Sequence, residues 1–275
     1  MPSLAENKSI WDGSYDWSHS GDEWSILWGS TETLWAGCLF PRIRAFVPAP
    51  TILEIAPGYG RFTQYLGRVC RRLIAVDISE RCVQACRGRF ADCSNMEFYV
   101  GDGMRLSNVA DASVDFCFSF DSLVHVELDV IESYLRELSR VLRPNGIAFI
   151  HHSNIGQYRR SLSVTRCIPP KLRKYLCQFG LLISSNTFRA ESVSASGVAN
   201  SAERIGLRVA SQEIINWSEN APRFLTDCIS VLTKQQSSET GRIRNTHFVR
   251  EGKYLRRMAK LYSRDGSAVH GRSND

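Results

Sequence analysis

Between residues 50 and 155, short apolar runs alternate with stretches in which apolar residues recur at helical spacing. This alternation is typical of βαβ units, in which helices connect parallel strands. The apolar runs predict five strands, at residues 51–56, 73–77, 96–100, 114–120 and 147–152. A chain with this order of elements is expected to form a doubly wound α/β sheet, with helices on both faces.

Two further strands, at residues 208–217 and 224–233, follow a predicted helix at 192–206. Only the short segment 218–223 separates them, whereas a parallel crossover needs a dozen or more residues. The pair is therefore expected to be antiparallel and to lie at one edge. The predicted fold is α/β, with a mostly parallel seven-stranded sheet and an antiparallel edge hairpin.

Three segments lie outside this alternation. Residues 1–50 contain five of the six tryptophans, and residues 155–190 form an insertion after the fifth strand. Both are expected over the carboxyl ends of the strands, where open α/β sheets bind ligands. We predict that the first is an aromatic lid, with packing of its tryptophans in the core as the alternative, and that the second flanks the substrate. Residues 234–275 are predicted to be a basic, flexible tail with one short possible helix at 248–262, after a domain at 51–233.

Charge and composition limit the classes of protein. The formal net charge of +6 lies wholly in residues 234–275, which carry ten of the 34 Lys and Arg residues and four of the 28 Asp and Glu residues. A basic tail can contact an anionic membrane surface. No apolar run approaches the ~20 residues of a membrane span, and the N-terminus lacks signal-peptide features. We therefore expect a cytoplasmic protein, with peripheral contact at the inner face of the membrane left open.

The nine cysteines are scattered without a CxxC pair. This pattern predicts reduced thiols rather than a disulfide framework, and it argues against a zinc site. The oligomeric state is not fixed by the sequence, and a homodimer remains open.

Acidic and glycine residues stand at the ends of three successive predicted strands. The first strand runs into Glu54-Ile-Ala56-Pro-Gly58-Tyr-Gly60 and then into a helix. Glycines there let a ligand approach the backbone closely, and the helix N-terminus offers free N–H groups. Asp77 ends the second strand, where a carboxylate can accept both hydroxyls of an adenosine ribose. Asp102, in Gly101-Asp102-Gly103, follows the third and can face an adenine amino group.

These acids resemble the pattern of class I S-adenosylmethionine-dependent methyltransferases, whose sheet is Rossmann-like. The first motif of that family is an acid followed by three alternating glycines; here Ala56-Pro57 replaces the first glycine. A nicotinamide site would need G-x-G-x-x-G, and Thr63 stands at its last position. The resemblance implies S-adenosylmethionine as the methyl donor, with donor contacts from Glu54, Ala56, Gly58, Gly60, Asp77, Ile78, Asp102, Gly103 and Asp121.

Four longer strings extend the resemblance over residues 10 to 233: EWSxxWGS, ILEIAPGYGRFTQYL, FSFDSLVHVE and FIHHSN. They are similar to methyltransferase modules that act on bacterial surface polysaccharides and related sugars. The resemblance implies O-methylation in glycan biosynthesis, with a sugar, glycan or lipid-linked saccharide as acceptor. O-methylation of a small natural product is the alternative. No nucleic-acid partner is expected, because FSFDSL stands where a nucleic-acid methyltransferase would carry an Asn-Pro tetrad.

Three side chains near the predicted fourth and fifth strands are candidates for catalysis. Methylation of a hydroxyl needs a base, and histidine serves near neutral pH. We predict His152 as that base, with His125 and Asp121 orienting it or binding the acceptor. Because side chains alternate along a strand, His151 and His152 should face opposite sides. Asp121, His125 and His152 could also hold Mg²⁺, although this metal prefers oxygen ligands.

The insertion carries cations and no acidic residue between 154 and 190. Cations beside a substrate mouth favour an anionic acceptor, such as a phosphorylated sugar or a lipid-linked diphosphate sugar. If the attacking atom is itself a phosphate oxygen, no base is needed. The cations are Arg159, Arg160, Arg166, Lys171, Arg173, Lys174 and Arg189.

Overall fold

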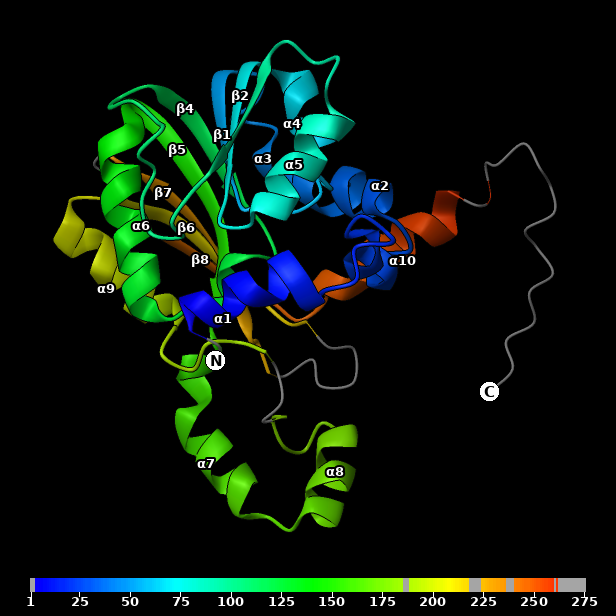
Figure 1. Ribbon diagram of the computed structural model, residues 1–275. Helices are drawn as coiled ribbons and strands as arrows, with labels where there is room; N and C mark the ends of the chain where they lie inside the picture. The colour runs from blue at the N-terminus through cyan, green and yellow to red at the C-terminus, as the bar shows by residue number, and fades with distance from the viewer. Residues whose placement is uncertain (1–2, 185–187, 218–223, 236–239, 260, 262–275) are drawn as a thin grey trace.

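The computed structural model describes residues 3–184, 188–217, 224–235, 240–259 and 261. Its centre is a sheet of eight strands in the order β3-β2-β1-β4-β5-β7-β6-β8 (Figure 1). The strands are β1 Ala49–Ile55, β2 Cys70–Asp77, β3 Met96–Val100, β4 Val114–Ser119, β5 Leu142–Ser153, β6 Arg208–Ile215, β7 Asp227–Thr233 and β8 Gly241–Asn245.

The five strands of the predicted alternation pair in parallel, with Leu53 opposite Ile74 and Cys117. Strand β7 lies between β5 and β6 and is antiparallel to both. The predicted α/β class and the antiparallel hairpin are therefore confirmed. The predicted strand count is corrected from seven to eight, because β8 pairs in parallel with the outer side of β6.

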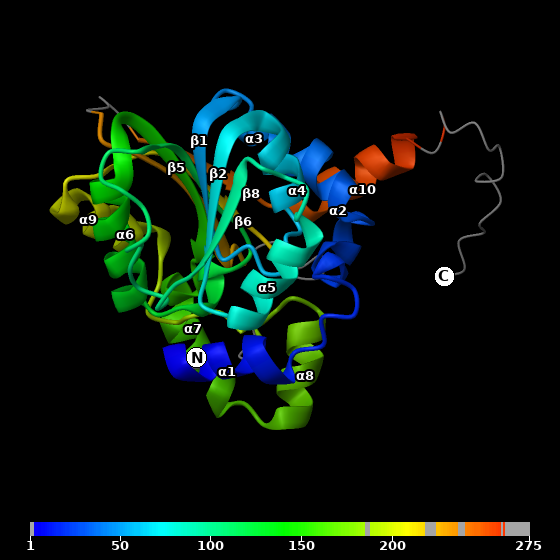
Figure 2. The ribbon, with the colours of Figure 1, turned by 45° about the horizontal axis from the view of Figure 1, so that its top comes forward.

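Helices cover both faces of the sheet (Figure 2). Side chains alternate along a strand, so successive residues of β1 pack in two different hydrophobic clusters. Leu53 packs in the cluster that includes residues of α6 and α9, whereas Ile52 packs with residues of the N-terminal segment. The helices are α1 Leu4–Ser9, α2 Thr31–Leu34, α3 Phe40–Ile43, α4 Thr63–Leu66, α5 Glu80–Arg89, α6 Leu128–Val141, α7 Arg159–Cys167, α8 Pro170–Gln178, α9 Ala195–Ile205 and α10 Phe248–Ala259.

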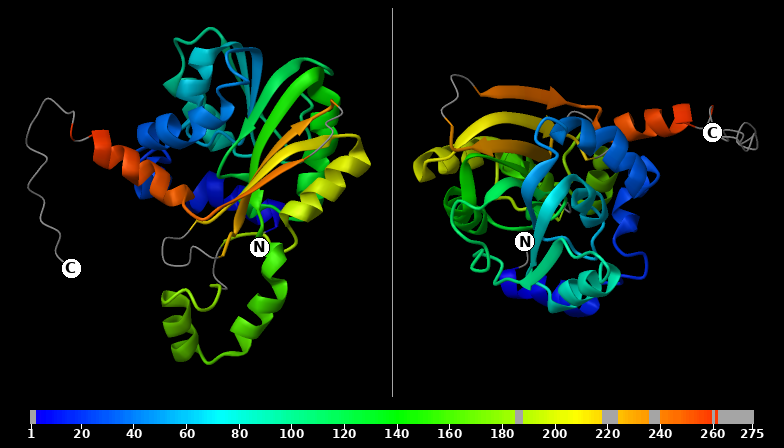
Figure 3. Two further views of the ribbon diagram at one scale, coloured as in Figure 1. Left: turned by 180° about the vertical axis from the view of Figure 1, so that it is seen from behind. Right: turned by 90° about the horizontal axis from the view of Figure 1, so that it is seen from above.

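The insertion after β5 forms α7 and α8, which project beyond the carboxyl ends of the parallel strands (Figures 1 and 3). We call residues 155–184 the arm. Within the described ranges, no helix is long and apolar enough to cross a membrane.

Within the predicted tail, α10 coincides with the possible helix at 248–262, whereas β8 occupies residues that were predicted to be flexible. Helix α10 lies beside α2 and the 3-10 helix Asp22–Trp28 (Figure 3). Phe248 and Trp28 are fully buried, and their rings are 5.7 Å apart. The C-terminal helix thereby holds the N-terminal segment against the sheet. Residues 262–275 of the predicted tail lie outside the described part.

Truncation of Phe248 tests this docking. Phe248→Ala should lower the free energy of unfolding by about 3–5 kcal/mol, because it removes a fully buried ring. Tyr254→Ala, on the same helix but 65% exposed, should change it by less than about 0.5 kcal/mol. Urea unfolding of both variants measures the difference. Equal effects would contradict the packing of α10 against Trp28.

Candidate active site

The loop after β1 depends on three residues with positive φ. Ala56, Gly58 and Gly60 have φ values of 57°, 57° and 82°. A Cβ on Gly60 would lie 2.5 Å from the Phe90 ring, so a side chain cannot fit there. Ala56 takes the left-handed conformation at a cost of about 1–2 kcal/mol, and its N–H donates to the Val76 carbonyl at 2.8 Å. The departure from the family's first glycine therefore leaves the turn intact.

Two buried acids support this loop. Gly58 N–H donates to Asp77 Oδ2 at 3.0 Å, and Ser79 N–H donates to Asp77 Oδ1 at 2.9 Å. Burial raises the pKa of Asp77 to about 6. Glu54 accepts a bond from the Thr63 hydroxyl at 2.6 Å, and burial raises its pKa to about 8. Thr63, which argued against a nicotinamide site, is thus the partner of the first acid.

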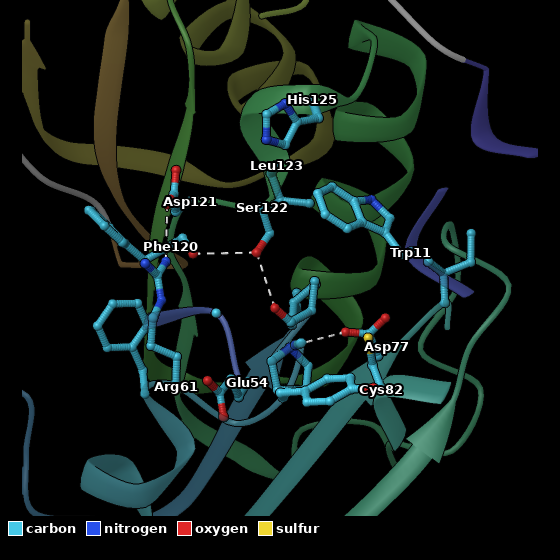
Figure 4. Close-up of a pocket in the computed structure, with 18 of the residues that line it drawn as sticks. Trp11, Glu54, Arg61, Asp77, Cys82, Phe120, Asp121, Ser122, Leu123 and His125 are labelled. Atoms are coloured by element: carbon cyan, nitrogen blue, oxygen red, sulfur yellow. Dashed lines mark hydrogen bonds and ion pairs between the residues drawn. The ribbon is translucent and has the colours of Figure 1, made fainter. Parts of the chain in front are cut away.

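The two acids open onto a pocket at the carboxyl ends of the strands (Figure 4). The pocket encloses about 1070 Å³, counting its open mouth. Its walls come from the loops after β1, β2, β3 and β4 and from the N-terminal segment. Of the predicted site residues, it brings together Glu54, Ala56, Gly58, Asp77, Ile78, Gly103, Asp121 and His125.

Two predicted donor contacts do not line this pocket. Gly60 lies behind the loop, against Phe90 and Cys86. Asp102 is exposed, and its carboxylate accepts the N–H groups of Met104 and Arg105 at 2.8 and 2.6 Å. In this structure Asp102 shapes the turn after β3.

The N-terminal segment supplies the aromatic wall. Trp11, Trp17 and Trp24 line the pocket, and the Trp17 ring stacks on Tyr59 at 4.5 Å. A Cβ placed on Gly58 would lie 3.1 Å from the Trp17 ring. The other tryptophans predicted as part of a lid differ: Trp28 and Trp35 are packed in the core. Of the five tryptophans, those before residue 25 line the pocket, which is where a lid has to lie.

Sequence reasoning missed Arg61. Its guanidinium pairs with Asp121 at 3.0 Å, and both side chains are at most 10% exposed. This ion pair joins the loop after β1 to the loop after β4. Asp121 itself has a φ of 64°, and its N–H donates to His151 Nδ1 at 3.1 Å. The sequence signal was an arginine directly after the second glycine of the motif.

The predicted alternation of the adjacent histidines is confirmed. His151 stacks on Phe120 and Trp217, with centroid separations of 4.6 and 5.1 Å. His152 turns to the opposite side, where its ring nitrogens each lie 2.8 Å from a partner, Ser230 Oγ and the Ser153 carbonyl oxygen. His152 is fully buried and does not line the pocket. This placement argues against the predicted role of His152 as the base.

His151 belongs to a buried network behind the pocket. Because its Nδ1 accepts from Asp121, its Nε2 carries the hydrogen and faces Asp227 Oδ2 at 3.3 Å. Arg189 donates to the same carboxylate at 2.8 and 2.9 Å. Burial opposes ionisation of Asp227, but Arg189 and His151 hold its pKa below the usual range. One of the predicted anion-binding cations is therefore committed to a buried ion pair.

His125 is the predicted catalytic residue that reaches the pocket. Its Nδ1 lies 2.6 Å from the Phe188 carbonyl oxygen, so Nδ1 carries the hydrogen. The Nε2 atom of the neutral ring is then an acceptor. Burial, with a contribution from Arg189, lowers the pKa of His125. The ring stands above Leu123 and beside Trp11, 6.1 Å between ring centroids (Figure 4).

The structure does not assemble the three side chains considered for Mg²⁺. Asp121 and His125 line the pocket, but His152 does not. Across the described ranges, no group of three or more His, Cys, Asp or Glu residues is arranged to hold a metal ion.

Residues 53–150 match a family described as a methyltransferase domain. This part of the chain is a class I S-adenosylmethionine-dependent methyltransferase domain. A phosphoethanolamine N-methyltransferase of Triticum aestivum is 27% identical over 139 residues, which are 48% of this chain and 28% of that protein. A ribosomal RNA small subunit methyltransferase A of Geobacter sulfurreducens is 41% identical over 64 residues, 22% of this chain and 23% of that protein. The chain thus spans less than a third of these curated relatives.

Solved structures share the fold of the methyltransferase domain. The PH0226 protein from Pyrococcus horikoshii has a TM-score of 0.53 at 21% identity, covering 82% of this chain and 96% of its own. A S-adenosylmethionine-dependent methyltransferase from Clostridium acetobutylicum has a TM-score of 0.57 at 13% identity, covering 80% and 98%.

The residues present fit S-adenosylmethionine. Asp77 lines the pocket at the end of β2, where the N–H groups of Gly58 and Ser79 hold its carboxylate, and a carboxylate can accept further bonds from ribose hydroxyls. A Cβ at Gly58 would crowd the Trp17 ring at 3.1 Å, so glycine lets the loop and the aromatic wall approach each other closely. We expect Asp77 to hold the ribose and the loop of residues 56–60 to support the rest of the donor.

Donor affinity should therefore depend on the ionisation of Asp77. Its raised pKa means that the carboxylate is present above about pH 6 and is lost as the pH falls below it. We expect donor affinity to fall by up to about tenfold per pH unit in that range. Asp77→Asn should weaken donor binding about 10- to 100-fold at pH 8 and remove this component of the pH dependence. Isothermal titration with S-adenosylmethionine measures both effects.

The exposed Asp92 provides the matched control, and Asp92→Asn should bind the donor as the wild type does. An Asp77→Asn variant with wild-type affinity would contradict the assignment of Asp77 to the ribose.

Proposed function

We propose that the protein transfers a methyl group from S-adenosylmethionine to an oxygen atom of a sugar or glycan acceptor, in glycan biosynthesis at the cytoplasmic face of the membrane. The observation that carries the proposal is His125. It lies on the pocket wall, its hydrogen is committed to the Phe188 carbonyl, and its pKa is lowered by burial. These features suit a base for a hydroxyl group.

The aromatic wall supports a sugar acceptor. Trp11, Trp17 and Trp24 surround one side of the pocket, and aromatic faces pack on the C–H faces of sugar rings. Asn7 and Ser122 add hydrogen-bonding groups to the same walls. The FSFDSLVHVE and FIHHSN strings, with their likeness to sugar-modifying methyltransferase modules, point to the same class of acceptor.

The donor supplies an electrophilic methyl group on a sulfonium. Asp77 and the loop after β1 hold the donor, and the Arg61–Asp121 pair fixes the wall between donor and acceptor. As the acceptor oxygen bonds to the methyl carbon, the bond between that carbon and the sulfonium sulfur would break and the neutral thioether would leave. His125 Nε2 would take the hydroxyl proton in the same step. The N-terminal segment, acting as a lid over both substrates, excludes water from the reacting groups.

The second candidate is methylation of a small natural product. It is favoured by the apolar and aromatic side chains that the N-terminal segment adds to the pocket wall, which would suit a compact acceptor. The similarity to phosphoethanolamine N-methyltransferases adds a nitrogen acceptor to this class, since tryptophan rings attract cationic amines.

The acceptor class can be read directly with methyl-labelled donor. The purified protein is incubated with labelled S-adenosylmethionine and with host extract separated into glycolipid, polysaccharide, small-molecule, protein and nucleic-acid fractions. Label in the glycolipid or polysaccharide fraction is the expected result. Label confined to small molecules would contradict a glycan acceptor and favour the second candidate.

Substitution of His125 tests the proposed base. His125→Gln should lower kcat about 10²- to 10⁴-fold, because no group remains to take the proton. Donor affinity should stay within about twofold of wild type. The wild-type rate should be lost as the pH falls below the lowered pKa of His125, since a protonated Nε2 atom can no longer take the hydroxyl proton. Rates measured across pH, with the acceptor that the labelling experiment identifies, give kcat and its pH dependence.

His247, which is exposed on the loop before α10, is the matched control, and His247→Gln should leave kcat unchanged. A small effect of His125→Gln on kcat would instead indicate an acceptor that needs no base, such as a phosphate oxygen.

A further inference from the structure

The arm is a packed structure in its own right. Ile155, Leu162 and Ile183 form a small buried cluster beneath its helices, and Tyr158 packs against this cluster. The arm stands away from the sheet in two opposite views (Figures 1 and 3). Side chains that remain exposed on it are therefore exposed on an ordered surface.

Large apolar side chains form a stripe on the outside of this ordered surface. Leu172, Tyr175 and Phe179 follow a spacing of three and four residues, which places them on one side of α8. Their exposed fractions are 51, 58 and 60%, and Leu181 beyond them is 53% exposed. The rings of Tyr175 and Phe179 lie 4.7 Å apart. We call these four residues the α8 stripe.

Cations border the α8 stripe. Lys171 and Lys174 lie on one side of it and Arg173 on the other, at helical spacing. Within the described residues, none of these three cations is in an ion pair, and no acidic residue occurs from 154 to 190. Arg166 differs, because it pairs with Glu191 just beyond the arm. The net effect is an apolar stripe within an uncompensated positive field.

We propose that the arm docks on an anionic lipid surface through the α8 stripe. Helices that lie in a membrane interface combine exposed Leu and aromatic residues with flanking lysines, whose charges meet anionic headgroups. The long lysine stems reach headgroups while the stripe enters the acyl boundary. A nucleic-acid partner would use the cations but would leave Leu172 and Leu181 without a favourable contact.

The arm is also placed to bring lipid close to the pocket. It leaves the carboxyl end of β5, and Phe188, shortly after it, accepts the hydrogen bond of His125. Docking would therefore set the pocket near the membrane surface. The consequence that the acceptor is a lipid-linked saccharide rests on the proposed function; the docking itself does not.

Vesicle flotation tests the docking without any methyl transfer. The full chain is mixed with vesicles of phosphatidylcholine alone or of equal parts phosphatidylcholine and phosphatidylglycerol. We expect flotation with the anionic vesicles only, and release at high salt. Tyr175→Ser/Phe179→Ser and Lys171→Ala/Lys174→Ala should each lower the bound fraction at least about tenfold.

Ile26, in the 3-10 helix Asp22–Trp28 outside both the arm and the basic tail, is 69% exposed, so Ile26→Ser is the matched control and should float as the wild type does. Equal flotation of all variants, or none by the wild type, would overturn the proposal. Binding of RNA that needs the lysines but not the aromatic pair, without flotation, would assign the arm to nucleic acid instead. Donor titration of each variant shows that it is folded and keeps a failure of docking separate from a failure of the proposed function.

Discussion

The hydrogen bond from Gly58 N–H to Asp77 links two of the strand ends that line the pocket. It joins the loop after β1 to the end of β2, two neighbouring parallel strands. Gly58 has a φ of 57° and presents its N–H to Asp77, while the Trp17 ring lies only 3.1 Å from where a Cβ would stand. This contact orients the Asp77 carboxylate, and the Trp17 ring of the aromatic segment packs against the same glycine.

The N-terminal segment depends on the far end of the chain. Trp17 and its neighbours reach the pocket because the following residues, up to Trp28, are held by Phe248 and Val249 of α10. Arg61 donates to Ser25 Oγ at 3.2 Å and pairs with Asp121, so it connects this segment to the loop after β4. The pocket is therefore assembled from residues that are far apart in sequence, and its shape follows from contacts made on both sides of the sheet.

The parallel strands and the acids at their ends could be predicted because each depends on local pattern and on strand direction alone. Strand β8 could not be predicted, because its side chains are mostly exposed and show no alternation of apolar and polar residues. It belongs to the sheet through its backbone pairing with β6. The alternation at His151 and His152 was predictable, but the side that faces the pocket was not. That side depends on how β4 and Trp217 pack against β5, which no local pattern records.

The same reasoning explains His125 and Arg61. Both residues lie on short segments between strands and helices, and tertiary contacts set the direction of their side chains. The Phe188 carbonyl orients His125, and the carboxylate of Asp121 orients Arg61. Residue type made His125 a candidate, whereas its tautomer and its access to the pocket came only from the structure. The proposed role of the base accordingly moves from His152 to His125.

The central claim is that this pocket binds S-adenosylmethionine between the strand ends and the N-terminal aromatic segment. Amide hydrogen exchange with and without the donor tests it most directly. We predict slower exchange on donor binding in residues 55–60, 77–79 and 119–123, and also in residues 10–25. Protection of the strand-end loops without residues 10–25 would contradict the lid, and no protection in any of them would contradict the donor site itself.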